Sequence, residues 1–249
     1  MQIVIGFVIA LFVGLTGVGG GSFTTPALVL LAGLSGAEAV GTALVFSTIV
    51  RLAAAPFYIA GKHIQVRYLW LMLAGAIPGL IGGTLLLASF HSRHWNPVVL
   101  IVIGAILIVS SVFTFLSRNV RRFTAGESPA WLPWLTLPIG VETGFSSAGA
   151  GALGTILLLN CSELPAAKVV GTDLLFGIVL AAIGSVLHFG FGSISVPVLK
   201  ALLLGGIPGV IAGCILAPRV STDRLKPLII GLTLVLGLQL VWSGLHPAR

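Results

Sequence analysis

The stretch GLTGVGGG at residues 14–21 returns 130 residues later as GFSSAGAG at residues 144–151. The same offset, without a gap, places GAIPGLIGG at residues 75–83 on GGIPGVIAG at residues 205–213. The chain therefore contains two homologous halves. In a membrane protein, a repeat of this size favours a transporter, because many transporter folds fuse two related halves around a central site.

The composition predicts an all-α, polytopic helical membrane protein. Hydrophobic residues make up 57% of the chain and charged residues only 8%, whereas soluble domains are about 25% charged. Apolar runs of about 20 residues, long enough to cross a bilayer, recur from end to end. The net charge of +7 does not indicate nucleic-acid binding, because the basic residues lie at the ends of apolar runs, where they set membrane orientation. The expected partners are the lipid bilayer and a small-molecule anion, and a homodimer is plausible for so small a body.

Six apolar runs predict full spans, at residues 37–60, 68–89, 97–117, 166–190, 197–218 and 226–246. Two further segments, 2–33 and 131–160, are each interrupted near the middle by a glycine cluster. A helix of 30 residues would be about 45 Å long, well over the roughly 30 Å of a hydrocarbon core. Each segment is therefore either one tilted or broken span, or a hairpin of two half-helices that returns to its starting side.

The positions of lysine and arginine favour the hairpin interpretation, because short cytoplasmic loops are enriched in both. Arg51 lies inside a span and is set aside. In the hairpin interpretation nine of the 12 remaining basic residues share one side: Lys62, Arg67, Arg118, Arg121, Arg122, Lys168, Arg219, Arg224 and Lys226. Eight full spans with parallel repeats, the alternative, divide them seven to five. The hairpin interpretation makes residues 1–117 and 131–249 inverted repeats, joined by a basic cytoplasmic linker at 118–130, with both termini outside.

The glycine clusters are candidate anion sites. Glycine lets the chain turn sharply and a ligand approach the backbone, and a helix that restarts after such a break presents free N–H groups and a positive dipole end. The alternative is close helix packing by small residues. An arginine inside a span is costly, and with neighbouring hydroxyls it suits an oxyanion. The predicted substrate-binding residues are Gly17, Gly19, Gly20, Gly21, Ser22, Ser47, Arg51, Ser146, Ser147, Gly149 and Gly151.

Two carboxylates inside the apolar segments, Asp173 and Glu142, are candidates for coupling transport to protons. Either could instead form a structural pair with Arg51. The repeat partner of Arg51 is Ala181 and that of Asp173 is Ala43, so the charged groups are not duplicated. His188 lies near a span end and is expected at the membrane interface. No spacing predicts a catalytic pair, a metal site or a cofactor site, so the chain is not expected to be an enzyme.

The glycine run at residues 17–22, followed by Pro26, is similar to the start of the TauE/SafE family of sulfite and organosulfur-anion exporters. Repeated motifs of the chain also resemble that family: Gly41-Thr42, Gly171-Thr172, Ile77–Gly79 and Ile207–Gly209. The resemblance extends from about residue 5 to about residue 245, although SAGAG at 147–151 departs from the glycine run of the first half.

Together these features predict a secondary transporter of small sulfur-containing anions. The resemblance implies a multi-pass permease of a bacterial or archaeal inner membrane, with sulfite and sulfoacetate among its substrates. The residues add the expectation of alternating access coupled to protons. The alternatives are an anion channel or a transporter of another small anion, such as a carboxylate. An intramembrane enzyme is the least favoured alternative.

Overall fold

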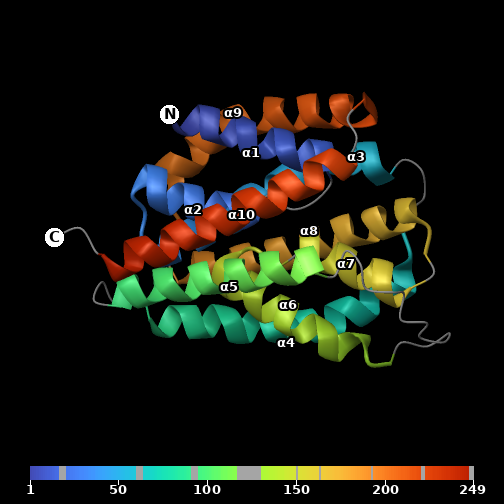
Figure 1. Ribbon diagram of the computed structural model, residues 1–249, viewed down its shortest axis with the longest axis horizontal. Coiled ribbons are helices and arrows are strands. Elements are labelled where there is room, and N and C mark those ends of the chain that lie inside the picture. Colours follow the sequence, from blue (N-terminus) through green and yellow to red (C-terminus); the bar gives the residue numbers. More distant parts are fainter. Residues whose placement is uncertain are drawn as a thin grey trace.

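The computed structural model describes residues 1–16, 21–59, 64–90, 95–116, 130–149, 151–162, 164–191, 193–219 and 222–246. This part of the chain is helical and contains no strand, which confirms the all-α class (Figure 1). The helices of the first half are α1 (Gln2–Thr16), α2 (Gly21–Ala32), α3 (Gly36–Ile59), α4 (Val66–Ser89) and α5 (Asn96–Leu116). Those of the second half are α6 (Leu132–Ser146), α7 (Ala152–Cys161), α8 (Ala166–Gly190), α9 (Val196–Leu216), the short 3-10 helix η3 (Ala217–Arg219) and α10 (Thr222–Leu245).

Five of these helices are long and apolar enough to cross a membrane: α3, α4, α5, α8 and α9. They coincide with five of the six predicted full spans. The sixth, α10, is continuous, but its described apolar part, Ile230–Leu245, is shorter than the others. The basic linker predicted at 118–130 lies almost wholly outside the described residues.

Both ambiguous segments are divided into two helices. In the second half the helix stops at Ser146, and Ser147 takes a left-handed backbone conformation with a φ of 64°. Gly151, which precedes α7, has a φ of 129°, a value that favours glycine because it has no Cβ. In the first half α1 ends at Thr16 and α2 begins at Gly21, while Gly17, Gly19 and Gly20 lie outside the described residues.

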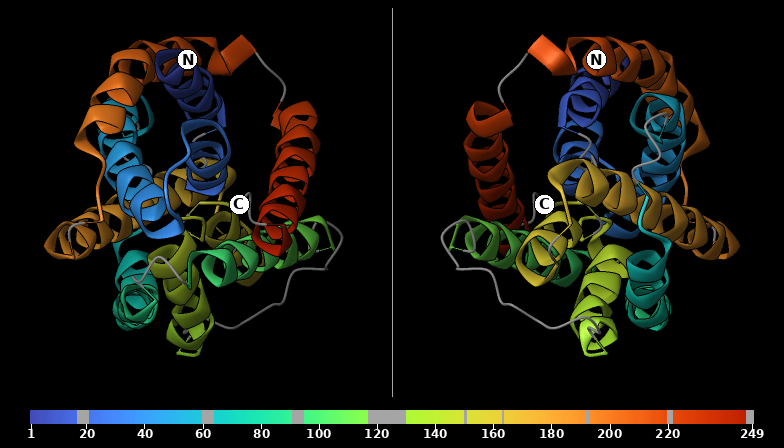
Figure 2. Two further views of the ribbon diagram at one scale, coloured as in Figure 1. Left: turned by 90° about the vertical axis from the view of Figure 1, so that its left-hand side faces the viewer. Right: turned by 90° about the vertical axis from the view of Figure 1, so that its right-hand side faces the viewer.

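The first helix of each half packs on the fourth helix of the other half. α1 runs parallel to α9, with Ile3 against Gly205 and Leu11 against Gly213. α6 packs on α4 in the equivalent register, with Val141 against Gly83. Val141 is the repeat partner of Leu11, and Gly83 is that of Gly213. A Cβ on any of these glycines would overlap a backbone carbonyl, so the Ile-Pro-Gly segments serve close helix packing, as is common for small residues in membrane helices. The two pairs lie on opposite sides of the molecule (Figure 2).

Two other pairs join equivalent helices, and both are antiparallel. α5 crosses α10 with Gly104 against Gly237 and Pro97 against Gly244. α3 crosses α8, and two equivalent hydrogen bonds join this pair to the helices that follow. The Ser195 N–H donates to Thr42 Oγ1 over 3.0 Å. The Gln65 N–H donates to Thr172 Oγ1 over 2.9 Å. Gln65 and Thr172 are the repeat partners of Ser195 and Thr42, each at an offset of 130 residues. The repeated Gly-Thr pair therefore holds the start of α4 and of α9.

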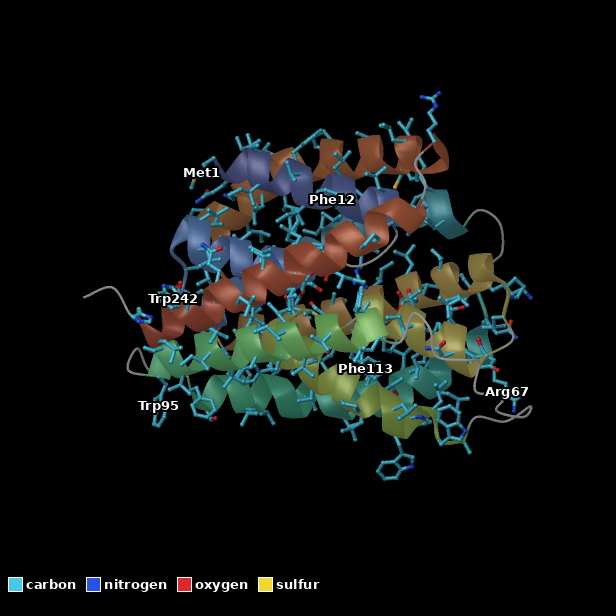
Figure 3. All side chains as sticks on the ribbon, viewed as in Figure 1. Met1, Phe12, Arg67, Trp95, Phe113 and Trp242 are labelled. Carbon is cyan, nitrogen blue, oxygen red and sulfur yellow. The ribbon has the colours of Figure 1, made fainter. Side chains whose placement is uncertain are left out.

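These directions show what the short helices do. α1 is parallel to α9. The short connection between α8 and α9 makes these two helices antiparallel, and α8 is also antiparallel to α3, which it crosses. α1 and α3 therefore run the same way, so the chain reverses between them at α2 (Figure 1). Met1, Trp95 and Trp242 lie toward one end of the molecule and Arg67 toward the other (Figure 3). This return is the one that the hairpin interpretation requires, while the bilayer side that each end faces stays a prediction.

Candidate functional site

Arg51 is buried at the crossing of α3 and α8. Only 2% of its surface is exposed, and it is the largest fully buried side chain among the described residues. Its guanidinium lies against the Cα of Gly177 on α8, where any Cβ would overlap Nη1. Glycine at position 177 therefore creates the space that the guanidinium occupies. A buried arginine in a membrane helix is energetically costly, and this one is accommodated by a residue chosen for its lack of a side chain.

Asp173 lies one helical turn before Gly177 on α8 and is 1% exposed. Its charge interacts with that of Arg51. Its Oδ2 accepts a hydrogen bond of 2.8 Å from Thr155 Oγ1 in α7, and its Oδ1 lies against Gly154. Of the two carboxylates that the sequence offered as partners of Arg51, the electrostatic interaction supports Asp173.

Glu142 occupies a different place. It is 8% exposed, and its Oε1 accepts a hydrogen bond of 2.5 Å from Ser110 in α5. Ser110 was not singled out by the sequence, because nothing in an apolar run of α5 indicates which helix it faces. The two coupling candidates are thus held by different helices, and the electrostatic interaction shown for Arg51 is with Asp173.

The two glycine-broken segments meet each other. The Cα of Gly21, at the start of α2, lies against the carbonyl of Ser147. The hydroxyls of Thr25 and Ser147 are 2.7 Å apart, and Ser147 Oγ also donates to the Gly21 carbonyl over 3.3 Å. Ser22 Oγ donates to the Ala148 carbonyl at 3.5 Å. The structure therefore brings together the predicted residues Gly21, Ser22 and Ser147.

Other predicted residues take local positions. Ser146 Oγ donates to the carbonyl of Glu142 in its own helix and accepts from the Ala148 N–H. Gly149 folds back on α6, against the Ile139 carbonyl. Ser47 is buried on α3, one turn before Arg51. These contacts are those of a helix end and a helix interior.

His188, expected at the membrane interface, is covered by the protein, and its depth in the bilayer stays a prediction. It is 2% exposed, and its Nε2 lies 3.1 Å from the carbonyl of Gly144, in the last turn of α6. Tyr58, its equivalent in the first half, donates its hydroxyl to the Gly14 carbonyl over 2.6 Å. The last carbonyls of a helix have no intrahelical partner, so each half clamps the end of its broken helix with one side chain. Identity matching missed this pair, because the two residues differ in type.

The site combines a buried cation, Arg51, with one short helix, α7, whose start is linked to it through Asp173. α7 starts two residues before Gly154, which faces Asp173, and Asp173 in turn interacts with Arg51. Helix N-termini and arginine both favour anions. Among the residues that the structure describes, no group of three or more His, Cys, Asp or Glu side chains could hold a metal ion.

The architecture and the buried charges are those of a membrane transporter. The family model described as "Sulfite exporter TauE/SafE" matches residues 2–240. The chain belongs to this family. It is 33% identical, over 96% of its length and 98% of the relative's, to the "Probable membrane transporter protein YjnA" of Bacillus subtilis (strain 168). No solved structure matches the chain. The family assignment and the apolar helices together define a multi-pass membrane protein.

Proposed function

We propose that this protein is a secondary transporter that moves a small sulfur-containing anion, such as sulfite or an organosulfonate, across the bacterial inner membrane. The observation that carries the proposal is the buried Arg51 at the α3–α8 crossing, linked through Asp173 to the start of α7. Arg51 supplies the full positive charge for the anion. The family's name supports sulfite, and the site supports a small oxyanion in general.

Alternating access between inverted repeats is the second part of the proposal. Supporting it, equivalent helices pair antiparallel across the crossings of α3 with α8 and α5 with α10. The repeat relates α1 to α6 and α9 to α4, so the α1–α9 pair and the α4–α6 pair are equivalent contacts. An inverted repeat can exchange the conformations of its halves and so expose one central site to each side in turn. A proton carried on Asp173 or Glu142 couples the movement to a gradient.

The test is transport by purified protein in liposomes, with sulfite, thiosulfate, sulfoacetate, taurine and sulfate as substrates. Arg51→Gln removes the charge, and the loss of a hydrogen bond to a charged group lowers anion affinity about tenfold to a hundredfold. Arg67→Gln, at the exposed start of α4, is the matched control and keeps wild-type affinity. Thermal unfolding of the same samples checks the fold.

The outcomes separate the alternatives. Saturable exchange of labelled for unlabelled anion supports a transporter, whereas uncoupled electrogenic flux far above transporter rates would support an anion channel. If a simple carboxylate such as acetate is added to the same assay and is preferred, the substrate class changes and the site stays the same. Unchanged transport by Arg51→Gln would remove Arg51 from the site and with it the basis of the proposal.

A further inference from the structure

The two halves differ at the start of their short second helices. α2 and α7 are equivalent, and Thr25 corresponds to Thr155. In the second half, Thr155 donates to the carboxylate of Asp173. In the first half, position 43, which corresponds to Asp173, is alanine, and the Thr25 hydroxyl instead meets Ser147 Oγ. One short helix therefore begins next to an internal anion and the other does not.

The carboxylate of Asp173 occupies the place that an anion would take at α7. The first turn of a helix presents unbonded N–H groups and the positive end of its dipole. Oδ1 of Asp173 lies against Gly154 in that turn and has no hydrogen-bond partner among the described residues, although the side chain is only 1% exposed. A buried, unpartnered acceptor aimed at a helix start marks a place where an anion is held.

The same carboxylate also faces the arginine. Arg51 and Asp173 interact electrostatically across the α3–α8 crossing, and Gly177, one turn from Asp173, admits the guanidinium. Both features that favour an anion here, the start of α7 and Arg51, therefore lie beside Asp173. An incoming anion must share them with this carboxylate or replace it.

We infer that Asp173 is a built-in competitor of the transported anion, and that the anion takes its place only when the carboxylate accepts a proton from water. This inference rests on the proposed function. A neutral carboxylic acid no longer competes for Arg51, while the arriving anion restores the opposite charge that Arg51 requires. Proton and anion therefore bind together, one proton for each anion, and Asp173 rather than Glu142 is the coupling residue.

The other titratable groups on the helices packed against α8 have different partners or positions. On α3, Glu38 bonds Ser35 and Tyr58 bonds Gly14. On α6, Glu142 accepts from Ser110, and on α8 itself His188 faces Gly144. α4 carries Arg67 and Tyr68 in its first turn, and α7 contributes the Thr155 hydroxyl. Arg51 is thus the charged group shown to act on Asp173.

The first experiment measures anion binding to the purified protein from about pH 5 to about pH 8, with thiosulfate, sulfoacetate and sulfate, which keep their charge over this range. In the wild type the dissociation constant rises up to about tenfold for each pH unit once Asp173 is ionised. Asp173→Asn imitates the protonated acid, so it binds as tightly at about pH 8 as the wild type does at about pH 5. The matched control Glu142→Gln keeps the wild-type pH dependence.

The second experiment needs no variant, so it stands even where Asp173→Asn does not fold. Anion is added to the wild type in weakly buffered solution at about pH 8, where Asp173 is ionised before binding, and a pH indicator reports uptake of about one proton for each anion bound. Binding without proton uptake would overturn the inference and leave the proposed function intact. So would an Asp173→Asn variant whose pH dependence matches the wild type.

The two failures are distinguishable. If the wild type binds and transports none of the anions and Asp173→Asn binds none either, the proposed function and the inference fall together. If the wild type transports an anion and a folded Asp173→Asn binds none at any pH, only the inference falls, because Asp173 then supports the site. Loss of pH dependence in Glu142→Gln would move the coupling to Glu142.

Discussion

Replacing Tyr58 by Phe tests whether the clamp on the broken helix stabilises the fold. The substitution removes the hydroxyl that donates to the Gly14 carbonyl over 2.6 Å and leaves the ring. Gly14 is buried in the last described turn of α1, and Tyr58 supplies the side-chain hydrogen bond to its carbonyl. Leaving such an acceptor unsatisfied costs about 1–3 kcal/mol. At about 2–4 °C for each kcal/mol in a chain of this size, a loss of about 2 kcal/mol lowers Tm by about 4–8 °C.

The assay is thermal unfolding in one detergent, followed by intrinsic fluorescence. Tyr68→Phe, at the other tyrosine of the chain, is the matched control, because the part of the chain that the structure describes shows no hydrogen bond at its hydroxyl. Its Tm should stay within about 1 °C of the wild type. His188→Phe should resemble Tyr58→Phe, and the double variant should lose the sum, since the sites are independent. Equal Tm values for Tyr58→Phe and Tyr68→Phe would refute the clamp.

Two further substitutions probe the α3–α8 crossing. Thr42→Val removes the acceptor of the Ser195 N–H and should lower the free energy of unfolding by about 1–3 kcal/mol, measured by thermal or chemical unfolding; an unchanged value would remove this bond from the frame. Gly177→Ala places a Cβ where the guanidinium of Arg51 lies, so anion affinity should fall about tenfold or more. Gly82→Ala, whose Cβ meets open space, should leave binding unchanged; equal affinities would contradict the packing argument.

The two halves, the breaks in their first segments and the closely packed helices could be predicted because they depend on the spacing of motifs along the chain. The 130-residue offset identified two halves, and the glycine clusters located the breaks between α1 and α2 and between α6 and α7. Small residues at Gly79 and Gly209 predicted close packing, which the helix pairs contain. Each of these inferences depends on local composition or on the offset, and both are visible in one chain.

The partners of the polar groups could not be predicted in the same way. Arg51 had two candidate carboxylates, and the choice of Asp173 over Glu142 depends on which helix crosses α3. His188 lies near the end of an apolar run, and nothing in that run indicates that α6, distant in sequence, buries its side chain. Depth along a helix says nothing about which face is covered. Such contacts follow from the packing of helices distant in sequence.

The asymmetry of the charges has a steric reason within the symmetric frame. The repeat partner of Gly177 is Ser47, and the partner of Arg51 is Ala181. A guanidinium fits only where the facing residue has no Cβ, so the half with serine cannot accept an arginine at position 181 without a clash. A second arginine at the same buried crossing would also add like-charge repulsion. One arginine near the crossing of equivalent helices therefore serves both halves, and a single carboxylate is enough to balance it.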